Sequence, residues 1–120
     1  MEKVDLQSLE KIISSSLFKD IKDYEILKEK VFLMNFPANM LYDTSSKENV
    51  LVQGVIDLLA IKGDSAILID YKYSSLSSER LKERYKKQLE LYAYAATKGL
   101  NLKVEKRLIV SLMRGEIIEV

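Results

Sequence analysis

Two neighbouring stretches in the middle of the chain have the pattern of β-strands. Residues 51–61 are apolar and rich in β-branched side chains except at Gln53 and Asp57, and a second apolar run follows at residues 66–72. Lys62-Gly63-Asp64 between them is a typical turn sequence. The pattern predicts two antiparallel strands joined as a β-hairpin.

A helical repeat of apolar residues follows this hairpin. Five residues separated by four, four, three and four positions fall on one face of an α-helix: Leu81, Tyr85, Leu89, Tyr92 and Ala96. The polar residues 74–78 are a natural start for this helix, and Gly99 is predicted to end it.

The first part of the chain is predicted to contribute a helical region and one strand. Apolar residues recur at helical spacing between Asp5, a plausible N-cap, and Tyr24. The short apolar run at residues 31–36, ended by Pro37, favours a strand. Residues 38–49 are mostly polar and are expected to form a loop.

The last part of the chain completes a single α/β domain. A strand is predicted over residues 104–113, and a turn at Arg114-Gly115 leads to a short extension at residues 116–120. The predicted order is α, β, β, β, α, β. A chain of 120 residues without repeats or linkers is long enough for one core, so residues 1–120 are expected to form one domain.

The composition excludes several kinds of site. The sequence has no cysteine and no histidine. This excludes zinc ribbons, cysteine nucleophiles, cysteine-bound iron-sulfur clusters, histidine-ligated metals and a Ser-His-Asp triad. Any chemistry must therefore use carboxylates, lysines, hydroxyls or a hard cation bound by oxygen.

Net charge and the remaining motifs limit the partners, the location and the cofactors that the sequence suggests. Nineteen Lys and Arg residues against eighteen Asp and Glu residues give a net charge of +1, which does not by itself favour nucleic acid, membranes or acidic partners. No stretch approaches the roughly 18 apolar residues of a membrane span, and no signal architecture is present. We therefore expect a cytoplasmic location. No glycine lies in a phosphate-binding loop, so no ATP site is expected in this chain.

Two aspartates and a lysine are the candidate catalytic residues. Asp70 and Lys72 share a strand face because side chains two positions apart point the same way. Asp57 is expected to share its face with Val55 and Leu59, an apolar row on which an unpaired charge is costly. If the hairpin brings Asp57 beside Asp70, the two carboxylates suit Mg²⁺ or Mn²⁺, and Lys72 could hold or deprotonate an attacking water. An ion pair between Lys72 and either aspartate fits the spacing equally well.

The predicted second helix carries two further polar features. Gln88 falls on the apolar stripe, where its amide needs either a backbone carbonyl or a functional partner. The first half of the helix has a local charge of +4, with Glu83 opposing five basic residues: Arg80, Lys82, Arg84, Lys86 and Lys87. These basic residues suit DNA phosphates, and they equally suit a solvated helix face.

Three short motifs resemble those of a known nuclease family. Gly54-Val55-Ile56-Asp57, Ile69-Asp70-Tyr71-Lys72 and Gln88-Leu89-Glu90-Leu91-Tyr92 are similar, in order and spacing, to the G-x-x-D, D-Y-K and Q-x-x-x-Y motifs of the RecB-like PD-(D/E)XK nucleases. The resemblance is closest to the C-terminal nuclease domain of the A subunit (AddA or RexA) of bacterial ATP-dependent helicase-nucleases. Glu29-Lys30-Val31-Phe32 also resembles the E-x-P-F segment of that family, with Val31 in place of proline.

The resemblance implies a fold and a reaction. The implied fold is restriction-endonuclease-like, with a mixed central sheet flanked by helices. The implied reaction is Mg²⁺-dependent hydrolysis of DNA phosphodiesters, of an exonuclease type that serves end processing and recombinational repair. Asp57, Asp70 and the backbone carbonyl of Tyr71 would bind Mg²⁺, with Mn²⁺ as a possible substitute, and Lys72 would orient and polarise the attacking water.

The resemblance also implies supporting residues and partners. Gln88 and Tyr92 match the Q-x-x-x-Y positions and would steady the site and the DNA strand beside it. Glu29, Arg84 and Tyr73 are further candidates for DNA contact or site support, Tyr73 by stacking on a base. The implied partners are single-stranded DNA ends, a helicase motor and a second helicase-nuclease subunit, with no membrane.

Two alternatives remain open from the sequence. The chain could be an inactive relative that uses the same fold for DNA binding or subunit docking. It could also be a small α/β domain whose ion-pair cluster has no connection with nucleic acid. The first alternative has no need for Asp57, Asp70 and Lys72 together, so divalent-metal binding separates it from a nuclease.

Overall fold

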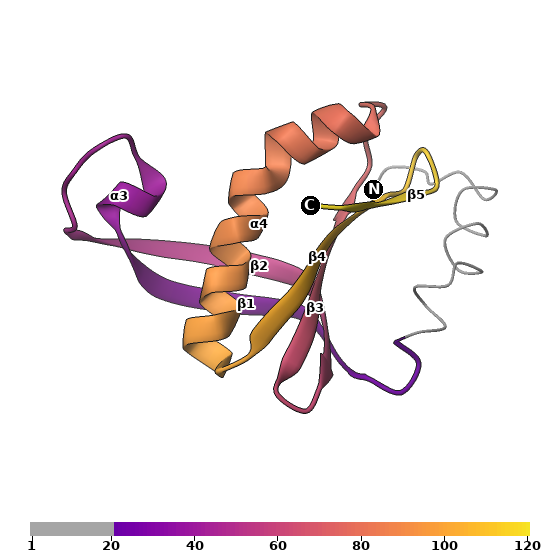
Figure 1. Cartoon of the computed structure of the whole chain (residues 1–120), viewed down its shortest axis with the longest axis horizontal. Helices are drawn as coiled ribbons and strands as arrows, with labels where there is room; N and C mark the ends of the chain where they lie inside the picture. The colour runs from indigo at the N-terminus through magenta and orange to yellow at the C-terminus, as the bar shows by residue number, and fades with distance from the viewer. Residues whose placement is uncertain (1–20) are drawn as a thin grey trace.

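The structure is a computed structural model that describes residues 21–120 (Figure 1). Five strands form one mixed sheet in the order β1-β2-β3-β4-β5; β3 and β4 run parallel, and the other neighbours run antiparallel. A long helix, α4, lies against one face of the sheet. The elements are β1 (Glu25–Pro37), α3 (Ala38–Leu41), β2 (Asn49–Lys62), β3 (Ser65–Lys72), α4 (Ser78–Leu100), β4 (Lys103–Ser111) and β5 (Glu116–Glu119).

This architecture confirms the α/β class and the restriction-endonuclease-like mixed sheet expected from the sequence. The helical region predicted between Asp5 and Tyr24 lies outside the described residues, except for a turn at residues 21–24. In residues 21–120, no helix is long and apolar enough to cross a membrane.

The predicted hairpin is confirmed by the pairing of β2 with β3. These strands pair antiparallel from Leu58 opposite Ile69 to Lys62 opposite Ser65. Gly63 in the connecting turn has a φ of 64°, a conformation that costs glycine little. The hairpin therefore fixes which residues of the two strands lie opposite each other at its open end.

The first strand is longer than the sequence indicated, and the segment after it is not only a loop. β1 begins at Glu25 rather than at residue 31 and pairs with β2 along its length. A long partner strand stabilises this charged segment in spite of its weak strand pattern. Residues 38–41, expected to be loop, form the short helix α3 with Ala38 buried.

The long helix starts where predicted and ends later. Ser77 caps its first turn, with its side chain accepting a hydrogen bond from the backbone N–H of Arg80 at 3.3 Å. The prediction that Gly99 ends the helix is wrong, because α4 continues to Leu100. The chain turns at Asn101, which has a φ of 56°, and asparagine tolerates this left-handed conformation better than most residues.

The end of the chain follows the prediction closely. β4 ends at Ser111, two residues earlier than expected, and a turn leads to β5 at the predicted extension. The parallel pairing of β4 with β3 places Ile109 beside Asp70 and Ser111 beside Lys72. β4 therefore forms one side of the region around the two candidate residues on β3.

The alternation of side chains along β2 changes phase at Asp57. Ile56 and Leu59 both belong to the core cluster under α4, whereas Leu58 belongs to the cluster on the opposite face of the sheet. In a regular strand, residues three positions apart lie on opposite faces. The expectation that Asp57 shares its face with Val55 and Leu59 is therefore wrong: Leu59 is buried, while Val55 is 41% exposed.

The neighbouring strand β1 changes phase at the same level. Leu27 and Phe32, five positions apart, both pack against the cluster under α4. Between them, Glu29 has a φ of 51°, which is unusual for a residue with a side chain. The register places Glu29 opposite Asp57, at a point where the regular pairing of β1 with β2 is interrupted. The sheet thus bends at the level of the candidate carboxylates.

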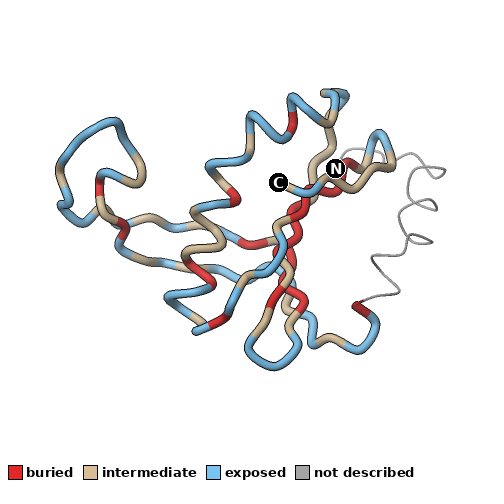
Figure 2. Tube along the Cα trace, in the orientation of Figure 1, coloured by how far each residue is buried: buried red, intermediate tan, exposed pale blue. Residues whose placement is uncertain are grey.

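Two hydrophobic clusters, one on each face, hold the sheet, and buried positions concentrate along its centre (Figure 2). The cluster under α4 includes Ile56, Leu59, Leu68, Leu81, Leu89 and Ile109. The cluster on the opposite face contains Ile21, Leu58, Ala60, Ile69, Leu108 and Val110. β3 contributes to both clusters, so its end is held firmly in the core.

Gly54 allows β2 to approach two aromatic rings, and we expect Gly54→Ala to destabilise the protein. A Cβ atom at this position would lie 2.5 Å from Cζ of Phe32 and 3.3 Å from Cε1 of Tyr92. Displacing these rings should cost about 1–3 kcal/mol of unfolding free energy, measured by urea denaturation. Gly99→Ala is the matched control, since its Cβ would lie 3.4 Å from the flexible Met34 terminus. An alanine inside this helix should be neutral or stabilising, and equal effects of the two substitutions would contradict the packing argument.

Candidate active site

The two candidate aspartates lie opposite each other where β2 and β3 separate. The last regular pair at this end is Leu58 with Ile69, and the next residues in register are Asp57 and Asp70. Asp57 Oδ2 accepts a hydrogen bond from the backbone N–H of Tyr71 at 2.8 Å. This bond fixes the Asp57 carboxylate beside the end of β3.

Lys72 and Asp70 form an ion pair under α4. The Lys72 ammonium lies 3.1 Å from Asp70 Oδ2 and 4.2 Å from the centre of the Tyr85 ring. The ring face attracts the cation and covers it from the α4 side. The predicted shared face of Asp70 and Lys72 is thus confirmed, and so is the ion pair that the spacing also allowed.

The Asp70 carboxylate is buried with little compensation for its charge. The residue is 3% exposed, and within the described chain Oδ2 has no aligned hydrogen-bond donor, because Lys72 approaches it without hydrogen-bond geometry. Burial raises the pKa of Asp70 from its ordinary 3.8 to about 6; the Lys72 charge opposes this rise, and the Asp57 carboxylate adds to it. The ionised form is therefore poorly stabilised by the protein alone.

This pKa predicts how the stability of the metal-free protein depends on pH. The pKa of Asp70 is about 6 in the folded protein against an ordinary 3.8, so between these values the folded state binds more protons than the unfolded state. The contribution of Asp70 to stability is therefore full below about pH 4 and is lost as the pH rises toward 6. The loss is at most about 3 kcal/mol. Urea denaturation in EDTA at a series of pH values, compared with Asp70→Asn, isolates this contribution; parallel curves for the two proteins would contradict it.

The residues at this point suit a divalent cation. The site offers two neighbouring carboxylates, and one of their oxygens, Asp70 Oδ2, is buried 3.1 Å from the Lys72 ammonium with no aligned hydrogen-bond donor in residues 21–120. A cation there would stabilise the ionised form of Asp70, as the protein alone does not. Across residues 21–120 no three or more acidic, histidine or cysteine residues cluster as a metal site. Mg²⁺ fits such a sparse set, since it commonly uses one or two carboxylates and keeps several waters.

Gln88 and Tyr92 contact each other next to this region. Gln88 Nε2 donates a hydrogen bond to the Tyr92 hydroxyl at 3.0 Å. Gln88 Oε1 is buried, and no donor for it is found in the part of the chain that the structure describes. The amide therefore found a side-chain partner rather than the backbone carbonyl that the sequence allowed. Tyr92 also packs edge-on against Phe32, with ring centres 5.4 Å apart.

The other three candidate residues, Glu29, Tyr73 and Arg84, come from different parts of the fold. Glu29 is exposed and opposite Asp57, and Tyr73 is half-buried just beyond the end of β3. Arg84 is exposed on α4, with its guanidinium carbon 5.7 Å from the centre of the Tyr85 ring. The five basic residues of the helix start are all exposed.

Two residues near the site are not indicated by the sequence pattern. Lys28 lines a pocket with Asp57, and only the register of β1 with β2 could have indicated this. Ser111 is fully buried beside Lys72, and among the described residues its hydroxyl has no hydrogen-bond partner. The only indication of Ser111 in the sequence is that it is a polar residue near the end of an apolar predicted strand.

A pocket of about 550 Å³ opens beside Asp57. It is lined by Lys28, Glu29, Asp57, Leu58 and Tyr71. A larger pocket, about 630 Å³, lies between α4 and the β4–β5 side of the sheet and includes none of the candidate catalytic residues. We regard the smaller pocket as the one relevant to chemistry, because it contains a carboxylate of the pair.

Comparisons with known proteins agree with this geometry. An ATP-dependent helicase/nuclease subunit of Ligilactobacillus salivarius is 35% identical over 98% of this chain and 10% of its own length. The subunit of the same name from Oenococcus oeni is 38% identical over 76% of the chain and 8% of its length. That of Streptococcus pyogenes is 40% identical over 69% of the chain and 7% of its length. The chain thus spans at most about a tenth of these relatives.

A scan against protein families gives the same assignment. Residues 5–117 match the profile of the PD-(D/E)XK nuclease superfamily, which includes every residue of the three motifs. The chain therefore belongs to the PD-(D/E)XK nuclease superfamily.

Proposed function

We propose that this chain is a metal-dependent nuclease domain that hydrolyses DNA phosphodiester bonds. The observation that carries the proposal is the buried Asp70 carboxylate, placed opposite Asp57 and 3.1 Å from the Lys72 ammonium. A buried charge with so little compensation is costly to a protein that does not use it. Membership of a nuclease superfamily supports hydrolysis as the reaction class.

Three groups at the end of the hairpin would hold the cation. They are the carboxylates of Asp57 and Asp70 and the backbone carbonyl of Tyr71, with Mg²⁺ as the expected ion and Mn²⁺ as a substitute. When bound, such a cation polarises a phosphate oxygen and stabilises the negative charge of the transition state. The Asp57 carboxylate is already oriented for binding by the Tyr71 N–H at 2.8 Å.

Lys72 acts on the attacking water in this proposal. Its ammonium pairs with Asp70 and lies against the Tyr85 ring, and an ammonium in an ion pair donates hydrogen bonds rather than accepting a proton. Lys72 therefore orients the water by hydrogen bonding and offsets negative charge as the new bond forms. The side chain is 21% exposed, so water and substrate can reach it.

Gln88 and Tyr92 support the site from α4. Their hydrogen bond and the packing of Tyr92 on Phe32 link the helix to β1. Arg84 and the exposed basic residues of the helix start supply phosphate contacts. Together they would hold the strand beside the carboxylates.

The biological setting is proposed from the relatives. They are named as subunits of an ATP-dependent helicase/nuclease, and this chain corresponds to at most about a tenth of their length. We infer that the domain acts on single-stranded DNA ends as an exonuclease in end processing and recombinational repair in the cytoplasm. A helicase motor and a second subunit would deliver the DNA, because no ATP site is expected in this chain.

The direct test is cleavage of an end-labelled single-stranded DNA by the purified chain. We expect degradation in Mg²⁺ or Mn²⁺ and none in EDTA, with restoration when excess metal is added back. Mn²⁺ binding by calorimetry is measured in parallel. A folded protein that neither binds Mn²⁺ nor cleaves DNA would overturn the proposal and favour an inactive docking module.

A further inference from the structure

We propose that Tyr85 on α4 is a positioning residue for the proposed reaction: its ring holds the Lys72 ammonium at the place where the ammonium acts on the attacking water. This inference rests on the proposed nuclease function, because it concerns the lysine of the same site. Tyr85 lies outside the three motifs, and the helical pattern indicates only that it belongs to the apolar face of α4. The ring acts through its electron-rich face and touches no reacting atom.

Two contacts confine the Lys72 ammonium, one from β3 and one from α4. The ammonium lies 3.1 Å from Asp70 Oδ2 and 4.2 Å from the centre of the Tyr85 ring, well within the roughly 6 Å over which a ring face attracts a cation. The Lys72 side chain is largely buried, and removal of water strengthens this attraction. The end of a flexible four-carbon side chain is thus held from two directions.

The Tyr85 ring is itself fixed relative to the sheet. Tyr85 lies one helical turn from Leu81 and one turn from Leu89, and both leucines are fully buried. Residues four positions apart share a helix face, and the Tyr85 side chain packs against the same core cluster as the two leucines. Rotation of α4 would expose both leucines. The ring is therefore a rigid support for a flexible lysine.

The ring becomes more important when Asp70 binds a metal ion. The Asp70 carboxylate cannot fully compensate both the Lys72 ammonium and a divalent cation, so metal binding weakens its ion pair with Lys72. The two positive charges also repel each other. The Tyr85 ring carries no net charge and is not a metal ligand in the proposed site, so its attraction for the ammonium remains. Tyr85 therefore keeps Lys72 near the carboxylates in the state that cleaves DNA.

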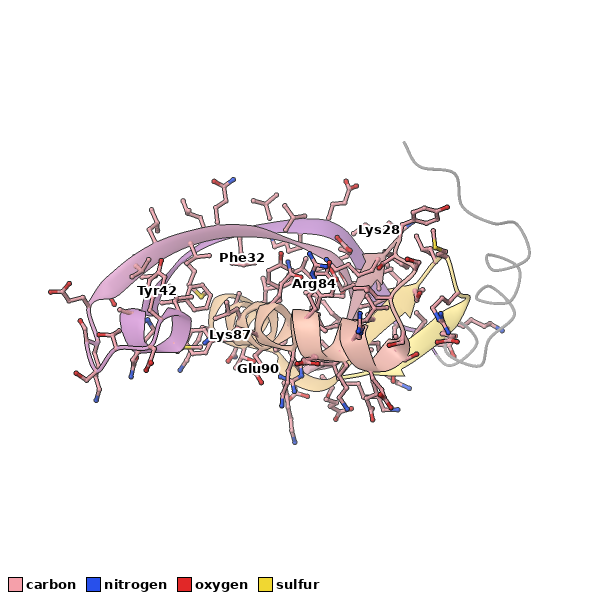
Figure 3. The ribbon with its side chains drawn as sticks, turned by 90° about the horizontal axis from the view of Figure 1, so that it is seen from above. Lys28, Phe32, Tyr42, Arg84, Lys87 and Glu90 are labelled. Carbon is pink, nitrogen blue, oxygen red and sulfur yellow. The ribbon has the colours of Figure 1, made fainter. Side chains whose placement is uncertain are left out.

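Arg84 is a second cation near the same ring. Its guanidinium carbon lies 5.7 Å from the ring centre, and Figure 3 shows Arg84 on the side of α4 toward β1 and β2. Arg84 is exposed, and exposed cations gain less from a ring than buried ones. Lys72 is both closer and more buried, so we expect it to be the main partner of the ring. Substitution of each cation separates the two contributions.

The test replaces Tyr85 by phenylalanine that carries an increasing number of ring fluorines. Fluorine withdraws electrons from the ring face, so the attraction for a cation decreases in steps while the shape of the ring is nearly kept. Tyr85→Phe should be neutral, because the contact uses the ring and not the hydroxyl. In Mg²⁺, kcat for cleavage of oligothymidine should fall by about three- to thirtyfold along the series. KM and Mn²⁺ affinity should stay nearly unchanged.

Stability without metal gives a second readout that does not depend on cleavage. In EDTA, the unfolding equilibrium constant from urea denaturation should rise by about three- to thirtyfold along the fluorine series. The trend should disappear in Lys72→Met and persist in Arg84→Gln. A ring that only fills space would give the same trend with and without the lysine.

Tyr94 provides the matched control. Its ring has Lys98 at 5.9 Å, in the last turn of α4, and neither residue belongs to the proposed site. The same fluorine series at Tyr94 should leave kcat unchanged.

Four results would overturn the role of Tyr85. The first is a kcat and a stability that do not depend on the number of fluorines, and the second is a stability trend that persists in Lys72→Met. The third is loss of the trend in Arg84→Gln, which would assign the ring to Arg84. The fourth is a change in KM alone, which would mean that the ring contacts DNA and does not position the lysine.

Failure of this inference is distinguishable from failure of the nuclease proposal. A wild-type chain that cleaves DNA in Mg²⁺ without any fluorine trend would overturn the role of Tyr85 and support the nuclease. A folded wild-type chain that neither cleaves DNA nor binds Mn²⁺ would overturn the nuclease, and with it the part of Tyr85 in a reaction. The stability series in EDTA would then still show whether the ring holds Lys72.

Discussion

Asp70→Asn is expected to abolish DNA cleavage and, in the same protein, to increase the stability of the metal-free fold. Cleavage should fall by at least about a hundredfold, because even residues that only orient a metal ligand contribute 10- to 100-fold. The free energy of unfolding at pH 7 in EDTA should rise by about 1–3 kcal/mol, because a neutral amide replaces a carboxylate whose pKa is raised to about 6 by burial. Cleavage of end-labelled DNA, Mn²⁺ calorimetry and urea denaturation measure the three effects.

Asp64→Asn is the matched control for this result. Asp64 is exposed in the turn between β2 and β3, at the far end of the hairpin from Asp70. The same chemical change there should leave cleavage, metal binding and stability nearly unchanged. If Asp70→Asn lowered stability, the buried carboxylate would have to be a net stabilising member of its ion pair, and the argument for a metal at this place would lose its physical basis.

Lys72→Met is expected to abolish cleavage while preserving metal binding. Methionine keeps an apolar side chain of similar length against the Tyr85 ring, where the ammonium now lies 4.2 Å from the ring centre, but it cannot orient water. A positioned group of this kind typically contributes about 10²–10⁴-fold to the rate. Removing a positive charge beside the carboxylates should leave Mn²⁺ affinity unchanged or increase it.

This prediction is specific because Lys72→Met should affect DNA cleavage and Mn²⁺ binding differently. Lys98→Met, an exposed position in the last turn of α4 beside the Tyr94 ring, removes the same charge away from the carboxylates and should retain cleavage. Loss of Mn²⁺ binding in Lys72→Met would mean that the lysine holds the site together rather than acting on water. Retained cleavage with bound Mn²⁺ would remove Lys72 from the reaction.

The secondary structure that the sequence predicted well has strong local signals. The turn at residues 62–64 and the apolar stripe of α4 each depend on short-range patterns, and both are confirmed. The errors lie where packing outweighs local preference. Gly99 remains helical because Asn101 provides the left-handed residue that ends α4, and the charged start of β1 is a strand because β2 pairs with it.

The candidate residues could be found from sequence because their types and spacing are chemically restrictive. Asp70 and Lys72 share a face by strand geometry alone, and in the structure the Lys72 ammonium lies 3.1 Å from Asp70 Oδ2. Their roles, and those of Asp57, Gln88 and Tyr92, remain proposals until the variants are measured. The family itself was indicated by three ordered motifs and is confirmed by the match over residues 5–117.

The sequence by itself determined the hairpin, the long helix and the family, and it indicated the candidate acidic pair and its lysine, because each of these depends on short-range patterns. Only the tertiary structure decided how these residues meet. The phase changes at Glu29 and Asp57, which open the pocket, contradict regular alternation and arise only when two strands bend together. The burial that raises the pKa of Asp70 depends on the packing of α4 and β4 around β3. A local sequence pattern does not show how such distant elements pack.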